Sequence, residues 1–204
     1  MTYYLAGATR LDISFDVSNL RIFTSNPGSG HWCALECVMR YLRGTSGYGL
    51  HYTGYPVVLE GYNDSNWISD AAEIKATSGY IFTIGGAAVS WRSRKQTILT
   101  KSTMEVELVA FESATTEAEW LKEILMDLPM VDKPVPTILL HCDNQSMITI
   151  VGNAKENAKF SRHVKRRIKS VKHLRNTEEI VVEYINTAQK LGGPFYKGII
   201  TCCD

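Results

Sequence analysis

The sequence lacks several features that would assign it to a class at once. No apolar run approaches the roughly 18–20 residues that span a bilayer, so we expect no membrane partner. The first residues lack the basic and apolar regions of a signal peptide. Neither sign of charge dominates, because 22 Lys and Arg balance 21 Asp and Glu. Any contact with nucleic acid must therefore come from a local cluster of charge.

The cysteines also give little guidance. The five cysteines are odd in number and scattered, and they form neither a disulfide framework nor a zinc-binding pattern. A reducing compartment is the simpler interpretation. The chain has 204 residues and 45% hydrophobic content, which fits one ordinary domain, or one domain with a small appendage.

Hydrophobic periodicity predicts a small helical segment over residues 1–50. One amphipathic helix is indicated by Ile13, Val17, Leu20 and Phe23, which recur at helical spacing. A second helix is indicated by a further apolar set, Trp32, Leu35, Val38, Met39 and Leu42.

The pattern changes after residue 50 and predicts a second domain over residues 51–200. Strands are expected over residues 57–62, 80–84 and 88–91, with a hairpin turn at Gly85-Gly86. A long helix follows, with an apolar stripe over about six turns, and then a strand over residues 137–142. A short helix from about Asn144, a helix from near Ser161 and a strand over residues 179–185 complete the order. This order predicts an α/β fold in which helices pack on a mixed sheet.

Three acidic residues stand out as candidates for one cluster. Asp64 ends the first predicted strand, where a turn-forming aspartate is the simpler interpretation. Asp143 lies where a strand meets a helix, and a helix N-cap is an equal alternative. Glu107 lies in the long helix, and its alternative is a solvated position. Ser102 and Glu105 fit a capping box, which gives Glu105 a structural role.

Cutting a phosphodiester with water gives such a cluster a purpose. Two divalent ions about 3.5–4 Å apart can stabilise the attacking and the leaving oxygen together. Magnesium binds oxygen ligands, keeps several waters and needs few carboxylates. Acids supplied by different chain segments at strand ends are the expected arrangement. The pattern of the chain therefore makes Asp64, Glu107 and Asp143 plausible neighbours that could bind divalent ions together.

Several collinear motifs carry a family resemblance from about Tyr41 to Gly198. They are Gly61-Tyr62-Asn63-Asp64-Ser65-Asn66-Trp67, Thr77-Ser78-Gly79-Tyr80-Ile81-Phe82, Val89-Ser90-Trp91, Ser102-Thr103-Met104-Glu105-Val106-Glu107, Cys142-Asp143-Asn144-Gln145-Ser146 and Ser161-Arg162-His163-Val164-Lys165-Arg166-Arg167. Together they resemble the ribonuclease H domain of copia-type LTR retrotransposon Pol polyproteins, most closely those of plants. Residues 1–50 resemble the end of the reverse transcriptase in the same polyprotein, without an identifiable polymerase catalytic motif.

The resemblance implies a ribonuclease H-like fold, with a five-stranded mixed sheet whose first three strands are antiparallel, and flanking helices. It implies metal-dependent hydrolysis of RNA in RNA–DNA hybrids. By motif position, the catalytic and metal-binding acids correspond to Asp64, Glu107 and Asp143. The expected cofactor is Mg²⁺ at a two-ion site, for which Mn²⁺ can substitute. The expected partners are a hybrid or other nucleic acid and the reverse-transcriptase portion of the polyprotein, in the cytoplasm, a virus-like particle or the nucleus.

One position departs from the family pattern. The family has a fourth acid near its end, and Gly193 occupies that position here. A missing ligand that costs about 4 kcal/mol would slow the reaction roughly a thousandfold, although water can replace a ligand of magnesium. His163 is a candidate auxiliary residue for product release or proton transfer, because a histidine near the metal site does so in related nucleases. The alternative is a partly exposed histidine in a basic helix.

The helix from Ser161 concentrates positive charge. Its basic residues are Arg162, Lys165, Arg166, Arg167, Lys169, Lys172 and Arg175, and almost no acid interrupts them. A solvated outer face is the simpler alternative. The concentration favours contacts with the phosphates of a nucleic acid, and Arg92, Arg94 and Lys95 could extend the same surface. A hybrid would then be recognised by its shape and 2′-hydroxyls more than by base sequence.

Three functions remain open on this basis. The first is an active ribonuclease H-type endonuclease. The second is a nucleic-acid-binding module that keeps the fold and the basic helix without the chemistry. The third is a structural module of the kind that joins polymerase domains. Gly193 distinguishes the first from the other two.

Overall fold

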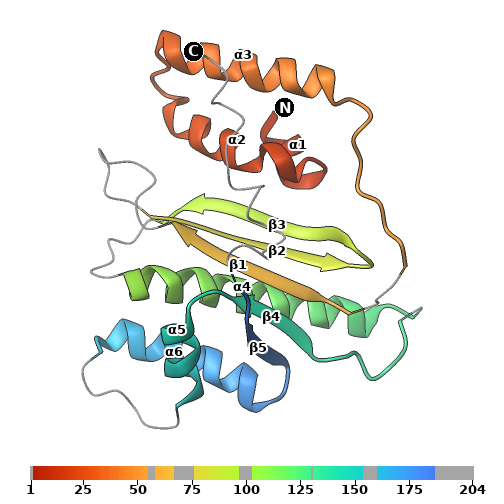
Figure 1. Ribbon diagram of the computed structural model, residues 1–204, viewed down its shortest axis with the longest axis vertical. Coiled ribbons are helices and arrows are strands. Elements are labelled where there is room, and N and C mark those ends of the chain that lie inside the picture. Colours follow the sequence, from red (N-terminus) through yellow and green to blue (C-terminus); the bar gives the residue numbers. More distant parts are fainter. Residues whose placement is uncertain are drawn as a thin grey trace.

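A computed structural model describes residues 2–54, 58–66, 76–96, 103–129, 131–153 and 160–186. Its elements fall into a group of N-terminal helices and a sheet that is covered by helices (Figure 1). The helices are α1 (Thr2–Ala8), α2 (Ser14–Leu20), α3 (Ser29–Gly44), α4 (Thr103–Asp127), α5 (Gln145–Gly152) and α6 (Arg162–Asn176), with 3₁₀ turns η1 (Leu11–Ile13) and η2 (Arg21–Phe23). The strands are β1 (Glu60–Asn66), β2 (Thr77–Ile84), β3 (Ala87–Lys95), β4 (Ile138–Cys142) and β5 (Ile180–Tyr184).

The five strands form one mixed sheet in the order β3-β2-β1-β4-β5. The first three strands are antiparallel neighbours, as the sequence predicted. Gly85 and Gly86 make the β2–β3 turn with φ of +59° and +81°, a region that residues with a Cβ atom rarely adopt. The predicted mixed α/β architecture is confirmed.

The parallel half of the sheet is formed by β4 and β5. β4 pairs with β1, with Tyr62 opposite His141, and β5 pairs with the other side of β4. Parallel strands need a crossover connection, and α4 lies between β1 and β4 in the chain. β1 and β4, which are far apart in the sequence, therefore lie side by side in the sheet.

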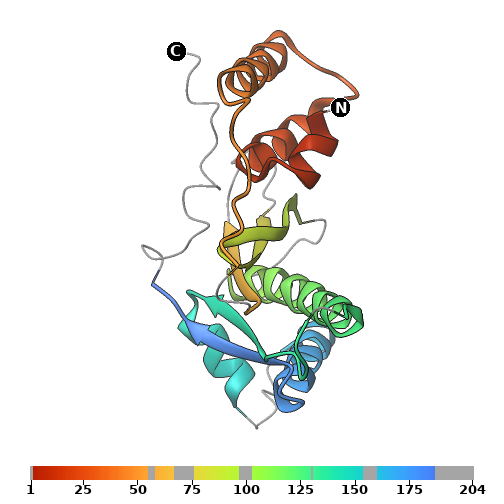
Figure 2. The ribbon, with the colours of Figure 1, turned by 90° about the vertical axis from the view of Figure 1, so that its right-hand side faces the viewer.

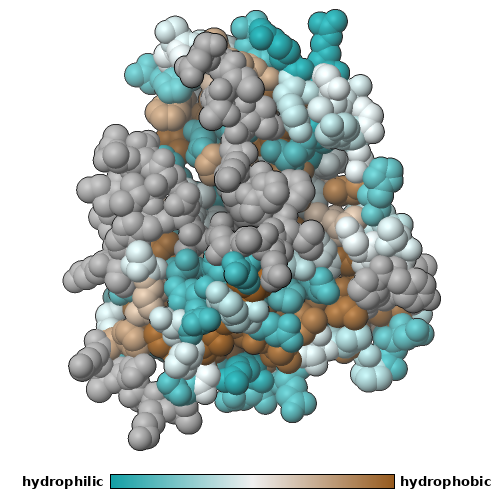
Figure 3. Space-filling view, in the orientation of Figure 1, coloured by the Kyte–Doolittle hydropathy of each residue, from teal (hydrophilic) through white to brown (hydrophobic). Residues whose placement is uncertain are grey.

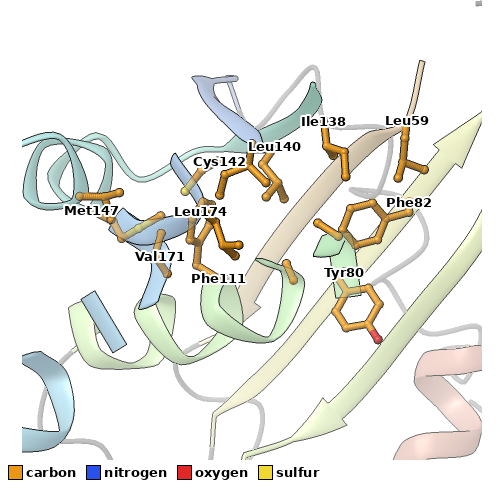
Figure 4. Close-up of a cluster of buried hydrophobic side chains, with 14 residues drawn as sticks. Leu59, Tyr80, Phe82, Phe111, Ile138, Leu140, Cys142, Met147, Val171 and Leu174 are labelled. Carbon is orange, nitrogen blue, oxygen red and sulfur yellow. The ribbon is translucent and has the colours of Figure 1, made fainter. Parts of the chain in front are cut away.

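The main core lies between the sheet and α4, α5 and α6 (Figure 4). Phe82 of β2, Leu140 of β4 and Phe111 of α4 are fully buried there. Gly61 of β1 explains the tight packing, because a Cβ atom at this position would lie 2.5 Å from the Phe82 ring and 2.9 Å from Leu140. Burying a large apolar side chain stabilises the fold by about 1.5–3 kcal/mol.

The N-terminal helices pack against the opposite face of the sheet, over β3 (Figure 2). The Trp91 Nε1 of β3 donates to the Ala6 carbonyl at 2.7 Å, and Ser18 Oγ donates to the Ser93 carbonyl at 2.8 Å. Leu11 adds an apolar contact to the cluster around Trp91. The division into a helical segment of residues 1–50 and a domain of residues 51–200 stays a prediction, because these contacts join the two parts directly.

Trp32 and Met39 belong to the apolar set that predicted α3, yet they are 62% and 53% exposed. Val38 is the buried residue of that helix. Among the described cysteines, Cys33 and Cys142 form no disulfide bond, whereas Cys37 is disulfide-bonded, which the scattered pattern had not predicted. No helix of the described residues combines the length and hydrophobicity that a membrane span requires.

Candidate active site and nucleic-acid interface

Asp64 and Asp143 occupy matching places on neighbouring parallel strands. Tyr62 of β1 is paired with His141 of β4, and their rings stack with centroids 4.7 Å apart. Asp64 lies two residues beyond Tyr62, and Asp143 lies two residues beyond His141. The parallel register therefore brings the two aspartate positions to the same end of the sheet, although the side chain of Asp64 is outside the described part of the structure.

The simpler interpretation of each aspartate is wrong. Asp64 lies within β1 and is paired with Gly79 of β2, so it is not a turn residue beyond the strand. The N-cap of α5 is Asn144, whose Oδ1 accepts a hydrogen bond from the Met147 amide at 2.9 Å. Asp143 is therefore not the capping residue. Neither aspartate is explained by the local structural role that its sequence position suggested.

Glu107 lies on the stripe of α4 that faces the main core. The next residues along this stripe are Phe111, Ala114 and Ala118, each fully buried, and they recur at the three- and four-residue spacing of one helix face. Glu107 is half-buried and its Oε2 atom is inaccessible to solvent. The alternative of a solvated position is therefore wrong. A charge placed among buried residues needs a compensating charge or hydrogen bonds.

Other acids of α4 have visible structural partners. Glu117 accepts hydrogen bonds from the Tyr80 hydroxyl at 3.0 Å and from Ser90 Oγ at 2.6 Å, which ties α4 to β2 and β3. Burial, helped by the nearby charge of Glu117, raises the pKa of Tyr80 to about 12. Glu112 forms an ion pair with Arg167 of α6. The capping role of Glu105 stays a prediction, because Ser102 lies outside the described residues.

Two stacked aromatic side chains, Tyr62 and His141, lie two residues before the aspartate positions. The Tyr62 hydroxyl donates to Glu60 Oε2 at 3.0 Å, and burial, together with the charge of Glu60, raises the pKa of Tyr62. The Tyr62 phenol therefore stays neutral at physiological pH, so no acid or base function is expected of it there.

The residues that could hold a divalent cation are carboxylates of the type that hard ions prefer. No group of three or more His, Cys, Asp or Glu side chains lies close enough to hold a metal within the described part of the chain. That part does not include the side chain of Asp64, so the predicted trio as a whole is not covered by this search. Gly193 also lies outside the described residues.

The predicted inner and outer faces of α6 are confirmed. Val164, Ile168, Val171 and Leu174 are buried. Three of the basic residues are bound within the protein: Arg167 pairs with Glu112, Lys172 donates to the Asn153 carbonyl, and Arg175 donates to the Val151 carbonyl. Burial lowers the pKa of Arg167.

The other four basic residues of α6 form one stripe, which we call the basic stripe: Arg162, Lys165, Arg166 and Lys169. Their spacing of three and four residues places them on a single helix face. All four are exposed, and their side chains have no ion pair or hydrogen bond among the residues that the structure covers. His163 is also exposed but is not part of this stripe. Its auxiliary role stays a prediction.

A second group of exposed basic residues lies on the edge strand β3. Arg92 and Arg94 of β3 are exposed and line a hollow between β2, β3 and α4. Hydrophobic residues gather over α4, β4 and β5 in the space-filling view (Figure 3), and Val181 of β5 is 42% exposed. Two groups of exposed basic residues thus lie on the edge strand β3 and on the outer face of α6.

Comparisons with known proteins identify relatives by sequence. No protein-family model matches the chain. The retrovirus-related Pol polyprotein from transposon TNT 1-94 of Nicotiana tabacum is 34% identical over 184 residues, which is 90% of this chain and 14% of the polyprotein. The secreted RxLR effector protein 161 of Plasmopara viticola is 44% identical over 119 residues, which is 58% of this chain and 84% of the effector. The chain therefore spans only about a seventh of the polyprotein that it matches.

Comparisons of structure concern the fold alone. The foamy viral protease–reverse transcriptase (dRH) in complex with double-stranded DNA matches 80% of this chain and 25% of the viral chain, with a TM-score of 0.51 and 17% identity. A ribonuclease H1 isolated from compost matches 64% of this chain and 85% of the enzyme, with a TM-score of 0.47 and 14% identity. With its five-stranded mixed sheet and flanking helices, the chain has a ribonuclease H-like fold and belongs to the family of retrovirus-related Pol polyproteins of plant transposons.

Proposed function

We propose that the chain binds RNA–DNA hybrids and hydrolyses their RNA strand at a cation site formed by Asp64, Glu107 and Asp143. The observation that carries the proposal is the parallel register of β1 and β4, which brings Asp64 and Asp143 to the same end of neighbouring strands. Glu107 supports it as the acid on the core-facing stripe of α4. The three positions come from separate segments of the chain, at β1, α4 and the end of β4.

The chemistry of these residues fits Mg²⁺, with Mn²⁺ as a substitute, because each offers carboxylate oxygens. When bound, a pair of divalent ions would stabilise the attacking and leaving oxygens of the phosphodiester. The carboxylates would bind and orient the ions. The buried Oε2 of Glu107 would keep one ligand atom away from bulk water.

The basic stripe and the pair Arg92 and Arg94 would bind the phosphates of the hybrid. Phosphate contacts supply affinity without reading base sequence, so recognition would depend on the shape and 2′-hydroxyls of the hybrid. The reverse-transcriptase portion of a longer polyprotein is the proposed protein partner, and an intracellular setting is the proposed location. These proposals fit the family, whose polyproteins are about seven times longer than the matched segment.

Gly193 makes slow hydrolysis the expected behaviour. It has no side-chain oxygen at the position of the fourth family acid, and the second ion would lose a ligand there. A loss of about 4 kcal/mol in transition-state stabilisation slows a reaction roughly a thousandfold. The alternative function is a catalytically inactive module that binds nucleic acid or supports the polymerase, and the unpaired charges of the basic stripe favour the binding role.

Cleavage of a labelled RNA–DNA hybrid in Mg²⁺ or Mn²⁺ separates these functions. We expect slow cleavage by the unaltered protein and faster cleavage, by up to about a thousandfold, after Gly193→Asp. Asp64→Asn in the Gly193→Asp background is the matched control and should abolish the gain. If neither the unaltered protein nor Gly193→Asp cuts the hybrid, the enzymatic function is rejected, and binding to the uncut hybrid then decides between the two inactive alternatives.

A further inference from the structure

Gln96 joins three elements at the start of α4. It directly follows β3 and is only 5% exposed. Its backbone amide donates to the Ala76 carbonyl, just before β2, at 2.7 Å. Its side-chain Nε2 donates to the Val106 carbonyl at 3.0 Å, in the first turn of α4. One residue thereby connects the end of the β2–β3 ladder to the beginning of the long helix.

The hydrogen bond from Gln96 is accepted by Val106, the residue directly before Glu107. A carbonyl oxygen has two lone pairs, so Val106 can accept the Gln96 bond in addition to a bond within the helix. Terminal turns of helices tend to fray, and a side chain that bonds the backbone of the first turn opposes this motion. Because Val106 and Glu107 are consecutive, restraint of one backbone position restrains the other.

Local burial makes water a poor replacement for this bond. Val106 is 1% exposed, and Ala110, one turn further along α4, is also 1% exposed. Removing the Gln96 donor would leave a carbonyl of the first turn without this partner in a place that bulk water does not reach. We expect the first turn to open more readily without this bond.

We propose that Gln96 is a positioning residue that holds Glu107 in place for the cation site. The inference rests on the proposed function for its purpose, but the restraint of the first turn of α4 stands on the contacts alone. Residues that orient metal ligands typically change metal affinity about 10–100-fold when they are replaced. Since Gln96 acts through the backbone, the effect on the affinity for Mn²⁺ lies at the lower end, about tenfold.

Thr115 offers a matched control on the same helix. It is 1% exposed, and its Oγ1 donates to the Glu112 carbonyl at 2.9 Å. Thr115→Val therefore also removes a hydrogen bond from a buried side chain to a carbonyl of α4, about two turns beyond Glu107. Both variants weaken α4, but only Gln96→Met removes the connection beside Glu107.

Two measurements test the proposal in the whole 204-residue chain. Amide hydrogen exchange is measured without divalent ions, and binding of Mn²⁺ is measured by the electron paramagnetic resonance of the free ion. We expect Gln96→Met to speed exchange over residues 104–110 and to weaken Mn²⁺ binding about tenfold. Thr115→Val should leave the exchange rates of residues 104–110 and the affinity for Mn²⁺ close to those of the unaltered protein. In a Glu107→Gln background, Gln96→Met should cause no additional loss of Mn²⁺ affinity, because both changes act on the same ligand.

The outcomes separate this inference from the proposed function. If Gln96→Met leaves exchange at residues 104–110 unchanged, or weakens Mn²⁺ binding no more than Thr115→Val does, Gln96 does not position Glu107. If the unaltered protein binds no Mn²⁺, the cation site is rejected. The exchange measurement then still decides whether Gln96 restrains the first turn of α4.

Discussion

Helices α4 and α6 pack against each other, yet they place their charges in opposite ways. The core-facing stripe of α4 contains Glu107 in line with fully buried Phe111, Ala114 and Ala118. The inner face of α6 contains only apolar residues, and its basic stripe points outward. Leu108 of α4 contacts Val164 and Ile168 of α6. The two helices therefore share one apolar contact, although only α4 has an acid on its core-facing stripe.

The difference separates charge that costs stability from charge that does not. An exposed base is hydrated in both the folded and the unfolded state, so the basic stripe neither stabilises nor destabilises the fold appreciably. A half-buried acid loses hydration on folding. Glu107 is therefore poorly explained by stability, whereas the basic stripe is compatible with any function that tolerates positive charge. Replacing Glu107 and, separately, the residues of the basic stripe tests whether the two kinds of charge differ in this way.

The largest expected effect follows from Glu107→Gln. Hydrolysis of the hybrid should fall at least about a thousandfold, because one cation ligand loses its charge. The free energy of unfolding, measured by urea denaturation without divalent ions, should stay within about 1 kcal/mol of the original value or rise, since a buried charge is removed. Glu119→Gln, at an exposed position of the same helix, is the control and should change neither quantity.

A loss of several kcal/mol in stability for Glu107→Gln would contradict this view. Such a result would mean that the carboxylate is a structural ion-pair partner in the core. The acid on the core-facing stripe of α4 would then be explained by stability.

A smaller effect is expected when the basic stripe is neutralised. Replacing Arg162, Lys165, Arg166 and Lys169 by Gln should weaken binding to a hybrid at least about tenfold at low salt. The slope of log K against log salt concentration should become shallower by about 3–4 units if all four contact phosphates. Fluorescence anisotropy in EDTA measures this without cleavage.

The same helix supplies the control for this experiment. Lys172 and Arg175 bond to carbonyls within the protein. Their replacement by Gln removes two charges of α6 and should leave the salt dependence nearly unchanged. An equal loss per charge from both sets of residues would show that only the overall charge matters, and the basic stripe would then have no special role.

The smallest effect is expected at the ion pair that joins the two helices. Glu112→Gln leaves Arg167 of α6 without its partner, and both side chains are about a quarter exposed. Pairs of this exposure contribute about 0–1 kcal/mol, so the free energy of unfolding should fall by about that amount. Glu123→Gln, an exposed acid on α4, is the control. A decrease above about 2 kcal/mol would mean that the ion pair, rather than the apolar contact, holds α6 on α4.

The sequence predicted the parts of this fold that depend on local pattern. Gly85-Gly86 indicated the hairpin because few other residues adopt its backbone angles. The apolar spacing of α6 predicted its buried face correctly. The mixed sheet followed from the order of strands and helices, and the family resemblance agreed with it.

Contacts between distant segments could not be predicted in the same way. The basic residues of α6 looked equivalent in the sequence, but Arg167 meets Glu112 of another helix. Asp143 and Asn144 both resemble capping residues, and only the geometry at the start of α5 selects Asn144. Gln96 gave no periodic signal, because its importance comes from one bond to Val106.

Exposure at the N-terminal helices was misjudged for a related reason. Helical periodicity identifies an apolar face but not the surface that covers it. Trp32 and Met39 fit the apolar spacing of α3, yet α3 buries Val38 instead. The prediction that Asp64 and Asp143 are neighbours is of a different kind, because it is supported by the parallel register of β1 and β4.

The pairing of β1 with β4 also has a consequence for the order of folding. During synthesis β1, the β2–β3 hairpin and α4 leave the ribosome before β4, so the antiparallel half of the sheet can form first. Pairing between segments so far apart is slow, because a long loop must close before the contact stabilises it. Asp64 can therefore meet Asp143 only late in folding. A nascent chain that stops after α4 would contain the hairpin but no complete acidic site, which would delay any metal-dependent cutting until the domain is nearly finished.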